Sequence, residues 1–197
     1  MVAILLLAGI YWYFSHRQPP VKNAGQPVER VVAFGDSLTA GFGAGGAKNA
    51  YPAVLEKLTG RRVINLGQSG ETAAHAPARL AEVLAWQPQM VLIEFGANDF
   101  MRSYSQAEAV AAVAKIVDAV QAAGAIAVVV DTGGPGMKDY SVAYEKLARE
   151  KQALFVPGIM RGIFNKGNLK SDMIHPNGEG YKLIAQRVYK VIAPYLK

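Results

Sequence analysis

A serine in a predicted strand-to-helix turn is the first group in this chain that could do covalent chemistry. Ser37 follows the apolar run 31–34 through Gly35 and Asp36, and a helix can begin at Leu38. Backbone N–H groups at the start of a helix are unpaired and can stabilise a developing negative charge. A serine hydroxyl in such a turn is a candidate nucleophile. The alternative is a helix N-cap, which is the commoner role for an isolated serine after a strand.

A histidine near the C-terminus could serve as the base for this serine. His175 follows Asp172 by three residues, so the carboxylate can accept the Nδ1–H and leave Nε2 free to take a proton. Pro176 favours an extended backbone at His175, which presents the ring rather than absorbing it into a helix. The other histidines, His16 and His75, have no obvious orienting carboxylate in the sequence.

Two further groups could bind the oxyanion that acyl transfer creates. Gly67 follows the predicted strand 62–65 and allows close approach of its backbone N–H, and Asn98 follows the predicted strand 90–95 and carries an amide donor. Each residue could equally form an ordinary turn. Complementary acyl-transfer groups at four successive segments are harder to explain as turns alone.

The elements that must position these groups alternate along the chain. Strand-like apolar runs occur at 30–34, 62–65, 90–95, 126–130 and 153–156, and helical patterns occur at 51–58, 74–85, 105–123, 139–151 and 178–196. The nearly continuous Val, Ile and Leu runs at 90–95 and 126–130 are typical of parallel strands covered on both faces. The pattern therefore predicts one α/β domain with a mostly parallel sheet and a ligand site at the carboxyl ends of its strands.

Four short blocks, taken in order, resemble those of the SGNH (GDSL-type) hydrolases. They are Gly35-Asp36-Ser37-Leu38, Gly67, Gly96-Ala97-Asn98-Asp99 and Asp172-x-x-His175, and together they span residues 31 to 180. The chain is most similar to the small bacterial arylesterase, thioesterase I and lysophospholipase group. The resemblance implies a flavodoxin-like three-layer α/β/α sandwich with a five-stranded parallel sheet.

The same resemblance implies roles for the site residues. Ser37 would be the nucleophile, His175 the general base and then general acid, and Asp172 the group that orients His175. The oxyanion hole would consist of the backbone N–H groups of Ser37 and Gly67 and the side chain of Asn98. The implied activity is hydrolysis of a carboxylic ester, namely a lysophospholipid, an aryl ester or an acyl thioester, through an acyl-enzyme.

The loop after the fourth predicted strand departs from the group's pattern. Residues 131–137 read Asp-Thr-Gly-Gly-Pro-Gly-Met where relatives usually carry an apolar loop ending in Asn-Tyr-Gly. The departure leaves the catalytic residues intact but changes the region that shapes the acyl pocket. We expect Phe100, Met137, Met173 and Ile174 to contact the substrate. A carbohydrate O-acetylesterase is the alternative within the same chemistry.

A nucleotide- or cofactor-binding α/β module is the alternative from a different class. Residues 41–46 match G-x-G-x-x-G, but they begin six residues after Gly35 rather than in the immediate turn. The second predicted strand ends in Asn65, where a dinucleotide fold places an acidic residue for the ribose. A glycine-rich lip beside the active site is the better interpretation.

Composition excludes several other kinds of site. The 197 residues contain no cysteine and three histidines, so disulfides and thiolate metal sites are excluded and we expect neither a metal nor a cofactor. The formal net charge is +6, but Lys and Arg are scattered, so we expect no nucleic-acid partner. The expected partner is a small-molecule or lipid ester, and the expected state is a monomer.

The N-terminus predicts membrane association or export. Residues 1–15 are predominantly apolar and end in an aromatic cluster, which suits a membrane anchor or a signal segment better than a buried core helix. A polar, proline-containing linker is predicted at 16–28 and the hydrolase domain at 29–197. We expect an uncleaved anchor first and a cleaved signal second, with the domain on the periplasmic side of a bacterial cell envelope. Arg17 and Lys22, taken alone, favour the opposite orientation.

Overall fold

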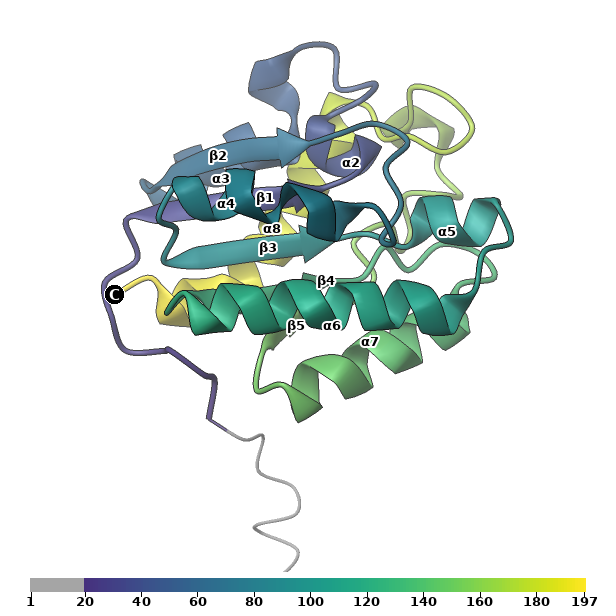
Figure 1. Ribbon diagram of the computed structural model, residues 1–197. Coiled ribbons are helices and arrows are strands. Elements are labelled where there is room, and N and C mark those ends of the chain that lie inside the picture. Colours follow the sequence, from purple (N-terminus) through teal and green to yellow (C-terminus); the bar gives the residue numbers. More distant parts are fainter. Residues whose placement is uncertain (1–19) are drawn as a thin grey trace, which may run out of the picture.

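Five parallel strands form a single sheet in the middle of the protein (Figure 1). The structure is a computed structural model and describes residues 20–197. The strands are β1 (Arg30–Gly35), β2 (Arg62–Gly67), β3 (Met90–Glu94), β4 (Ile126–Val130) and β5 (Leu154–Val156), and they lie in the order β2-β1-β3-β4-β5. Each neighbouring pair is parallel. The predicted five-stranded parallel sheet is confirmed.

Side chains of the central strands alternate between the two faces of the sheet. In β1, Val31 and Ala33 join one buried cluster, whereas Val32 and Phe34 join the other. Every residue of β3 and β4 is buried. Burial on both faces is why these strands form nearly continuous apolar runs in the sequence. The exception in β3 is Glu94, a buried carboxyl at its carboxyl end.

Helices cover both faces of the sheet, as Figure 1 shows. The buried side chains of α3 (Tyr51–Thr59) and α8 (Gly178–Ile192) belong to one cluster, and those of α4 (Leu80–Ala85), α6 (Gln106–Ala122) and α7 (Lys138–Glu150) belong to the other. These layers confirm the predicted α/β/α sandwich. The remaining short helices are α2 (Ser37–Ala40), α5 (Ala97–Met101), and the 3-10 turns η1 (Ala47–Asn49), η2 (Ala76–Arg79), η3 (Gly167–Leu169) and η4 (Ala193–Tyr195).

Two predicted helices differ from the observed ones. The range 74–85 was expected to be one helix, but it divides into η2 and α4, with Pro77 at the start of η2. The final helix was expected to reach 196, but α8 ends at Ile192 and η4 follows with Pro194 inside it. Proline has no backbone N–H to continue a helical ladder, which accounts for the end of α8 just before Pro194.

The helix start predicted at Ser105 is confirmed. The Ser105 hydroxyl oxygen accepts the backbone N–H of Glu108 at 3.3 Å, so it caps α6. The helix ends at Ala122, and Gly124 follows in a left-handed conformation with φ +84°.

The described part of the predicted linker lies against the domain. Within the range 16–28, Asn23 donates hydrogen bonds of 2.9 Å to the carbonyls of Gln121 and Ala125, and Val28 is buried. These contacts extend the packed domain to residues before 29. The predicted anchor or signal at 1–15 lies outside the described residues, and within 20–197 no helix is long and apolar enough to cross a membrane.

Candidate active site

Ser37 begins the short helix that follows β1. Asp36, and not Ser37, is the N-cap of α2, because its Oδ1 accepts the Leu38 N–H at 2.9 Å. The helix N-cap, which was the alternative role for Ser37, is therefore Asp36. This leaves the Ser37 hydroxyl available to another partner.

That partner is the imidazole of His175. Its Nε2 lies 3.1 Å from Oγ of Ser37, and its Nδ1 lies 2.8 Å from Oδ2 of Asp172. With the proton on Nδ1, His175 donates to Asp172 and accepts the Ser37 hydroxyl. The structure therefore brings the three predicted catalytic residues into one chain of hydrogen bonds, with the ring largely covered and the carboxyl partly exposed.

The loop backbone holds the carboxylate of Asp172 in place. Its Oδ1 accepts the N–H groups of His175 at 2.8 Å and of Ile174 at 2.9 Å. These backbone bonds, that of His175 first, lower the pKa of Asp172 to about 2. Asp172 is therefore ionised at neutral pH and can stabilise a positively charged imidazole.

The glycine-rich segment after α2 contacts His175. The ring centroid of Phe42 lies 4.5 Å from that of His175. The buried Tyr181 hydroxyl donates to the Phe42 carbonyl at 2.7 Å and so ties this segment to α8. The sequence predicted a lip here but not these two residues. Glycines at 41 and 43 on either side of a single aromatic residue were the available signal.

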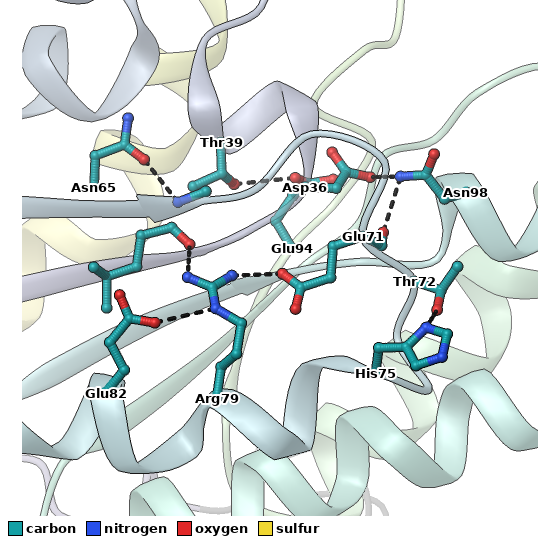
Figure 2. A network of polar contacts seen from close by, with 12 residues as sticks. Asp36, Thr39, Asn65, Glu71, Thr72, His75, Arg79, Glu82, Glu94 and Asn98 are labelled. Carbon is teal, nitrogen blue, oxygen red and sulfur yellow. Dashed lines mark hydrogen bonds and ion pairs between the residues drawn. The ribbon is translucent and has the colours of Figure 1, made fainter.

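Gly67 and Asn98 both lie against the turn that carries Ser37. A Cβ on Gly67 would collide with the α2 backbone at Thr39 and Ala40, so only glycine allows β2 to approach this helix so closely. The Asn98 amide nitrogen donates to Oδ2 of Asp36 at 3.0 Å and to the Glu71 carbonyl at 2.9 Å (Figure 2).

Two of the predicted oxyanion donors have acceptors within the protein. The Gly67 N–H donates to the Asn65 side chain at 2.9 Å, and the Asn98 amide is bound as described above. For the Ser37 N–H, no acceptor lies within hydrogen-bond distance among residues 20–197. A substrate oxygen at this site would thus meet the unpaired Ser37 N–H. The Gly67 N–H and the Asn98 amide would first have to leave their acceptors within the protein.

A buried carboxyl pair lies directly behind this turn. The carboxyls of Asp36 and Glu94 lie next to each other (Figure 2), and both are almost completely buried. Burial, followed for Asp36 by the charge of Glu94, raises the pKa of both carboxyls. The sequence did not assign a role to either side chain.

An apolar cavity of about 230 Å³ opens beside Ser37 and His175. The predicted substrate residues Phe100, Met137 and Ile174 line it. Met173, in contrast, is 86% exposed and does not line the cavity, so its predicted contact with the substrate stays a prediction. The remaining lining residues are Asp36, Leu38, Ala97, Met101, Thr132, Gly134, Pro135, Met160 and Phe164.

The arrangement does not favour the cofactor-binding alternative. Residues 41–46 follow α2 rather than the end of β1, where a dinucleotide motif would lie. Asn65 holds the Gly67 N–H rather than facing an open ribose site. In the part of the chain that the structure describes, no three His, Cys, Asp or Glu side chains are grouped to hold a metal ion.

Comparisons with known proteins agree with this geometry. The model of the GDSL-like Lipase/Acylhydrolase family matches residues 33–183. The Escherichia coli K12 protein named thioesterase 1/protease 1/lysophospholipase L1 is 31% identical over 176 residues, which cover 84% of each chain. The Vibrio mimicus arylesterase is 31% identical over 186 residues, covering 88% of this chain and 92% of the arylesterase.

A solved structure extends the likeness to three dimensions. The crystal structure of TesA superposes with a TM-score of 0.79 at 27% identity, covering 85% of this chain and 99% of TesA. The family predicted from the four sequence blocks is confirmed by these matches. The chain belongs to the GDSL-like lipase/acylhydrolase family, the SGNH hydrolases.

Proposed function

We propose that this protein is a serine esterase that cleaves carboxylic esters through an acyl-enzyme on Ser37. The observation that carries the proposal is the hydrogen-bonded chain from Ser37 through His175 to Asp172 at the mouth of an apolar cavity. The protein belongs to a family of lipases and acylhydrolases, which supports ester hydrolysis as the reaction.

The first half of the reaction transfers the acyl group to the enzyme. His175 takes the proton of the Ser37 hydroxyl as Oγ attacks the ester carbonyl carbon, and the carbonyl oxygen becomes an oxyanion. Collapse of this intermediate breaks the bond to the leaving alcohol or thiol, which receives the proton from His175. Asp172 keeps the imidazole in the required tautomer and stabilises its charged form.

The second half uses water in place of the hydroxyl. His175 removes a proton from water as the water oxygen attacks the acyl carbon, and it then returns that proton to Oγ of Ser37. The products are a carboxylic acid and the free enzyme. In both halves the Ser37 N–H, the Gly67 N–H and the Asn98 amide would bind the oxyanion, and the latter two would exchange protein acceptors for it.

The acyl group is proposed to occupy the apolar cavity. Its lining by Phe100, Met137 and Ile174 suits a hydrocarbon chain, as in a lysophospholipid, an aryl ester or an acyl thioester. The names of the two curated relatives describe enzymes that act on such compounds. A lipid-derived substrate also suits the proposed tether at residues 1–15.

The cellular setting is part of the proposal. The curated relatives are bacterial proteins. We propose a periplasmic enzyme, with residues 1–15 as anchor or export signal ahead of a monomeric hydrolase domain. Protease accessibility in intact cells and in spheroplasts tests this: digestion in spheroplasts alone supports the periplasm, and protection in both contradicts it.

Hydrolysis of p-nitrophenyl esters from acetyl to palmitoyl tests the proposed activity. The Ser37→Ala variant should lose hydrolysis, whereas Ser105→Ala, which removes a helix cap that does not line the cavity, should retain it. Unchanged activity in Ser37→Ala would refute the mechanism. A strong preference for acetyl that extends to acetylated polysaccharide would favour a carbohydrate esterase, and nucleotide binding without ester hydrolysis would favour the cofactor module.

A further inference from the structure

Glu94 connects three segments that build the active site. It ends β3, and its carboxyl accepts the hydroxyls of Thr39 in α2 at 3.0 Å and of Thr132 after β4 at 3.2 Å. Figure 2 shows the contact between Thr39 and Glu94. The Thr39 hydroxyl also lies 3.1 Å from the hydroxyl of Tyr51. Thr132 also lines the apolar cavity. Glu94 is completely buried, so these contacts are not those of an exposed surface carboxylate.

The neighbouring glycine leaves the space that this carboxyl occupies. A Cβ on Gly35 would lie 2.9 Å from Oε2 of Glu94 and would also press on the Thr39 hydroxyl. Gly35 precedes Asp36 and Ser37, so the first residue of the nucleophile turn and the buried carboxyl fit together. The local sequence is compatible with this geometry only while position 35 lacks a side chain.

The second carboxyl of the pair holds the catalytic turn. Asp36 accepts the Leu38 N–H at the start of α2 and the Asn98 amide, the proposed oxyanion donor. Within residues 20–197 neither Asp36 nor Glu94 forms a salt bridge to lysine or arginine. Two adjacent buried carboxyls without a cation cannot both be ionised at low cost, and the usual solution is one shared proton.

We propose that Glu94 is a positioning residue of this active site. By sharing one proton with Asp36, it holds that carboxyl against the Asn98 amide and the first turn of α2. The sharing also leaves one negative charge instead of two behind the position where the oxyanion forms. This inference rests on the proposed function and assigns Glu94 no contact with the substrate.

Other titratable groups around the pair are accounted for. Those that face it are His175, Tyr51 from α3, Tyr144 from α7 and Tyr181 from α8. Burial raises the pKa of the three tyrosine hydroxyls, so they stay neutral. Two other buried carboxyls, Asp99 and Asp131, form hydrogen bonds to groups outside the pair. Asp99 accepts the Ala73 N–H. Asp131 accepts the N–H groups of Gly133 and Gly158 and the Ser141 hydroxyl.

Two substitutions at position 94 separate positioning from bulk packing. Glu94→Gln keeps the size of the side chain, and its amide can donate permanently to Asp36 while its oxygen accepts a threonine hydroxyl. Glu94→Leu keeps apolar volume but offers neither group. We expect Glu94→Gln to keep kcat within about threefold, and Glu94→Leu to lose about 10²-fold in kcat with little change in KM, similar to loss of an oxyanion donor.

The pH profile supplies a readout that packing alone would not move. In the wild type, loss of the shared proton at alkaline pH places a second charge behind the oxyanion, so kcat should fall there. Glu94→Gln cannot lose this proton and should remain active at higher pH. An identical alkaline fall in both proteins, or a Glu94→Leu variant as active as wild type, would overturn the proposal.

Infrared spectroscopy of the full chain tests the shared proton without using activity. The difference spectrum of wild type minus Glu94→Gln at neutral pH should contain the carbonyl band of a protonated carboxyl, even if Glu94→Leu fails to fold. Absence of the band would overturn the proposal. Because this readout is independent of turnover, it remains valid if Ser37→Ala refutes the esterase itself.

Discussion

The Nε2 atom of His175 lies 3.1 Å from Oγ of Ser37, although the two residues are 138 positions apart in the chain. The fold makes this contact possible. Ser37 follows the carboxyl end of β1, and His175 precedes α8, whose buried side chains pack in the same cluster as Val31 and Ala33 of β1. The Tyr181 hydroxyl, one turn into α8, binds the Phe42 carbonyl and fixes the two segments together.

Removing the charge of Asp172 should slow the reaction without abolishing it. Asp172→Asn keeps the size of the side chain but no longer favours the required imidazole tautomer or its charged form. We expect kcat to fall by about 10²–10⁴-fold, with a smaller change in KM. Steady-state kinetics on a p-nitrophenyl ester measure this. A variant with wild-type kcat would show that the hydrogen bond to Nδ1 does not assist the base.

Asp172 should also contribute to stability in a defined pH range. Its folded pKa of about 2 lies below the ordinary value of about 3.9, so its contribution is present above that ordinary value and disappears as the pH falls toward 2. Urea unfolding of wild type and Asp172→Asn should therefore give a difference that shrinks as the pH falls below 4. A difference that stays unchanged between pH 5 and pH 2 would contradict the lowered pKa.

Gly67 should tolerate no side chain. In Gly67→Ala the new Cβ would meet the α2 backbone, and we expect a loss of about 1–3 kcal/mol in unfolding free energy together with reduced kcat. Gly167→Ala is the matched control, because nothing lies within 4 Å of its added Cβ, and it should change stability by less than about 0.5 kcal/mol. Equal effects of the two substitutions would argue against the close approach of β2 to α2.

The cavity assigned to the acyl group can be filled from one side. Ile174→Trp should reduce kcat/KM for octanoyl esters by about tenfold relative to acetyl esters, because Ile174 lines the cavity. Met173→Trp introduces the same ring at the adjacent position. Because Met173 does not line the cavity, this variant should leave the chain-length preference unchanged. If both variants shift the preference equally, the acyl group lies elsewhere.

Sequence reasoning succeeded where local pattern determines the structure. The apolar runs of β3 and β4 are buried on both faces, so their positions were evident. Ser37, Asp172 and His175 were found because short ordered blocks carry them. Pro194, in contrast, ends the predicted final helix at a position that the apolar periodicity alone does not reveal.

The remaining features depend on contacts between distant segments. Glu94 lies inside the predicted buried strand 90–95, and only the fold brings its carboxyl to Asp36 and Thr39. Ile174 and Met173 are adjacent and both apolar, yet the loop that Asp172 organises brings only Ile174 to the cavity. Such orientations are set by long-range packing rather than by the local sequence.

Covalent trapping tests the central role of Ser37 most directly. A p-nitrophenyl alkylphosphonate should release one equivalent of p-nitrophenol per protein, stop ester hydrolysis and leave a phosphonyl adduct on the peptide that contains Ser37, as identified by mass spectrometry. Ser37→Ala should form no such adduct. An adduct on another residue, or continued ester hydrolysis by a protein fully modified at Ser37, would contradict the assignment of Ser37 as the nucleophile.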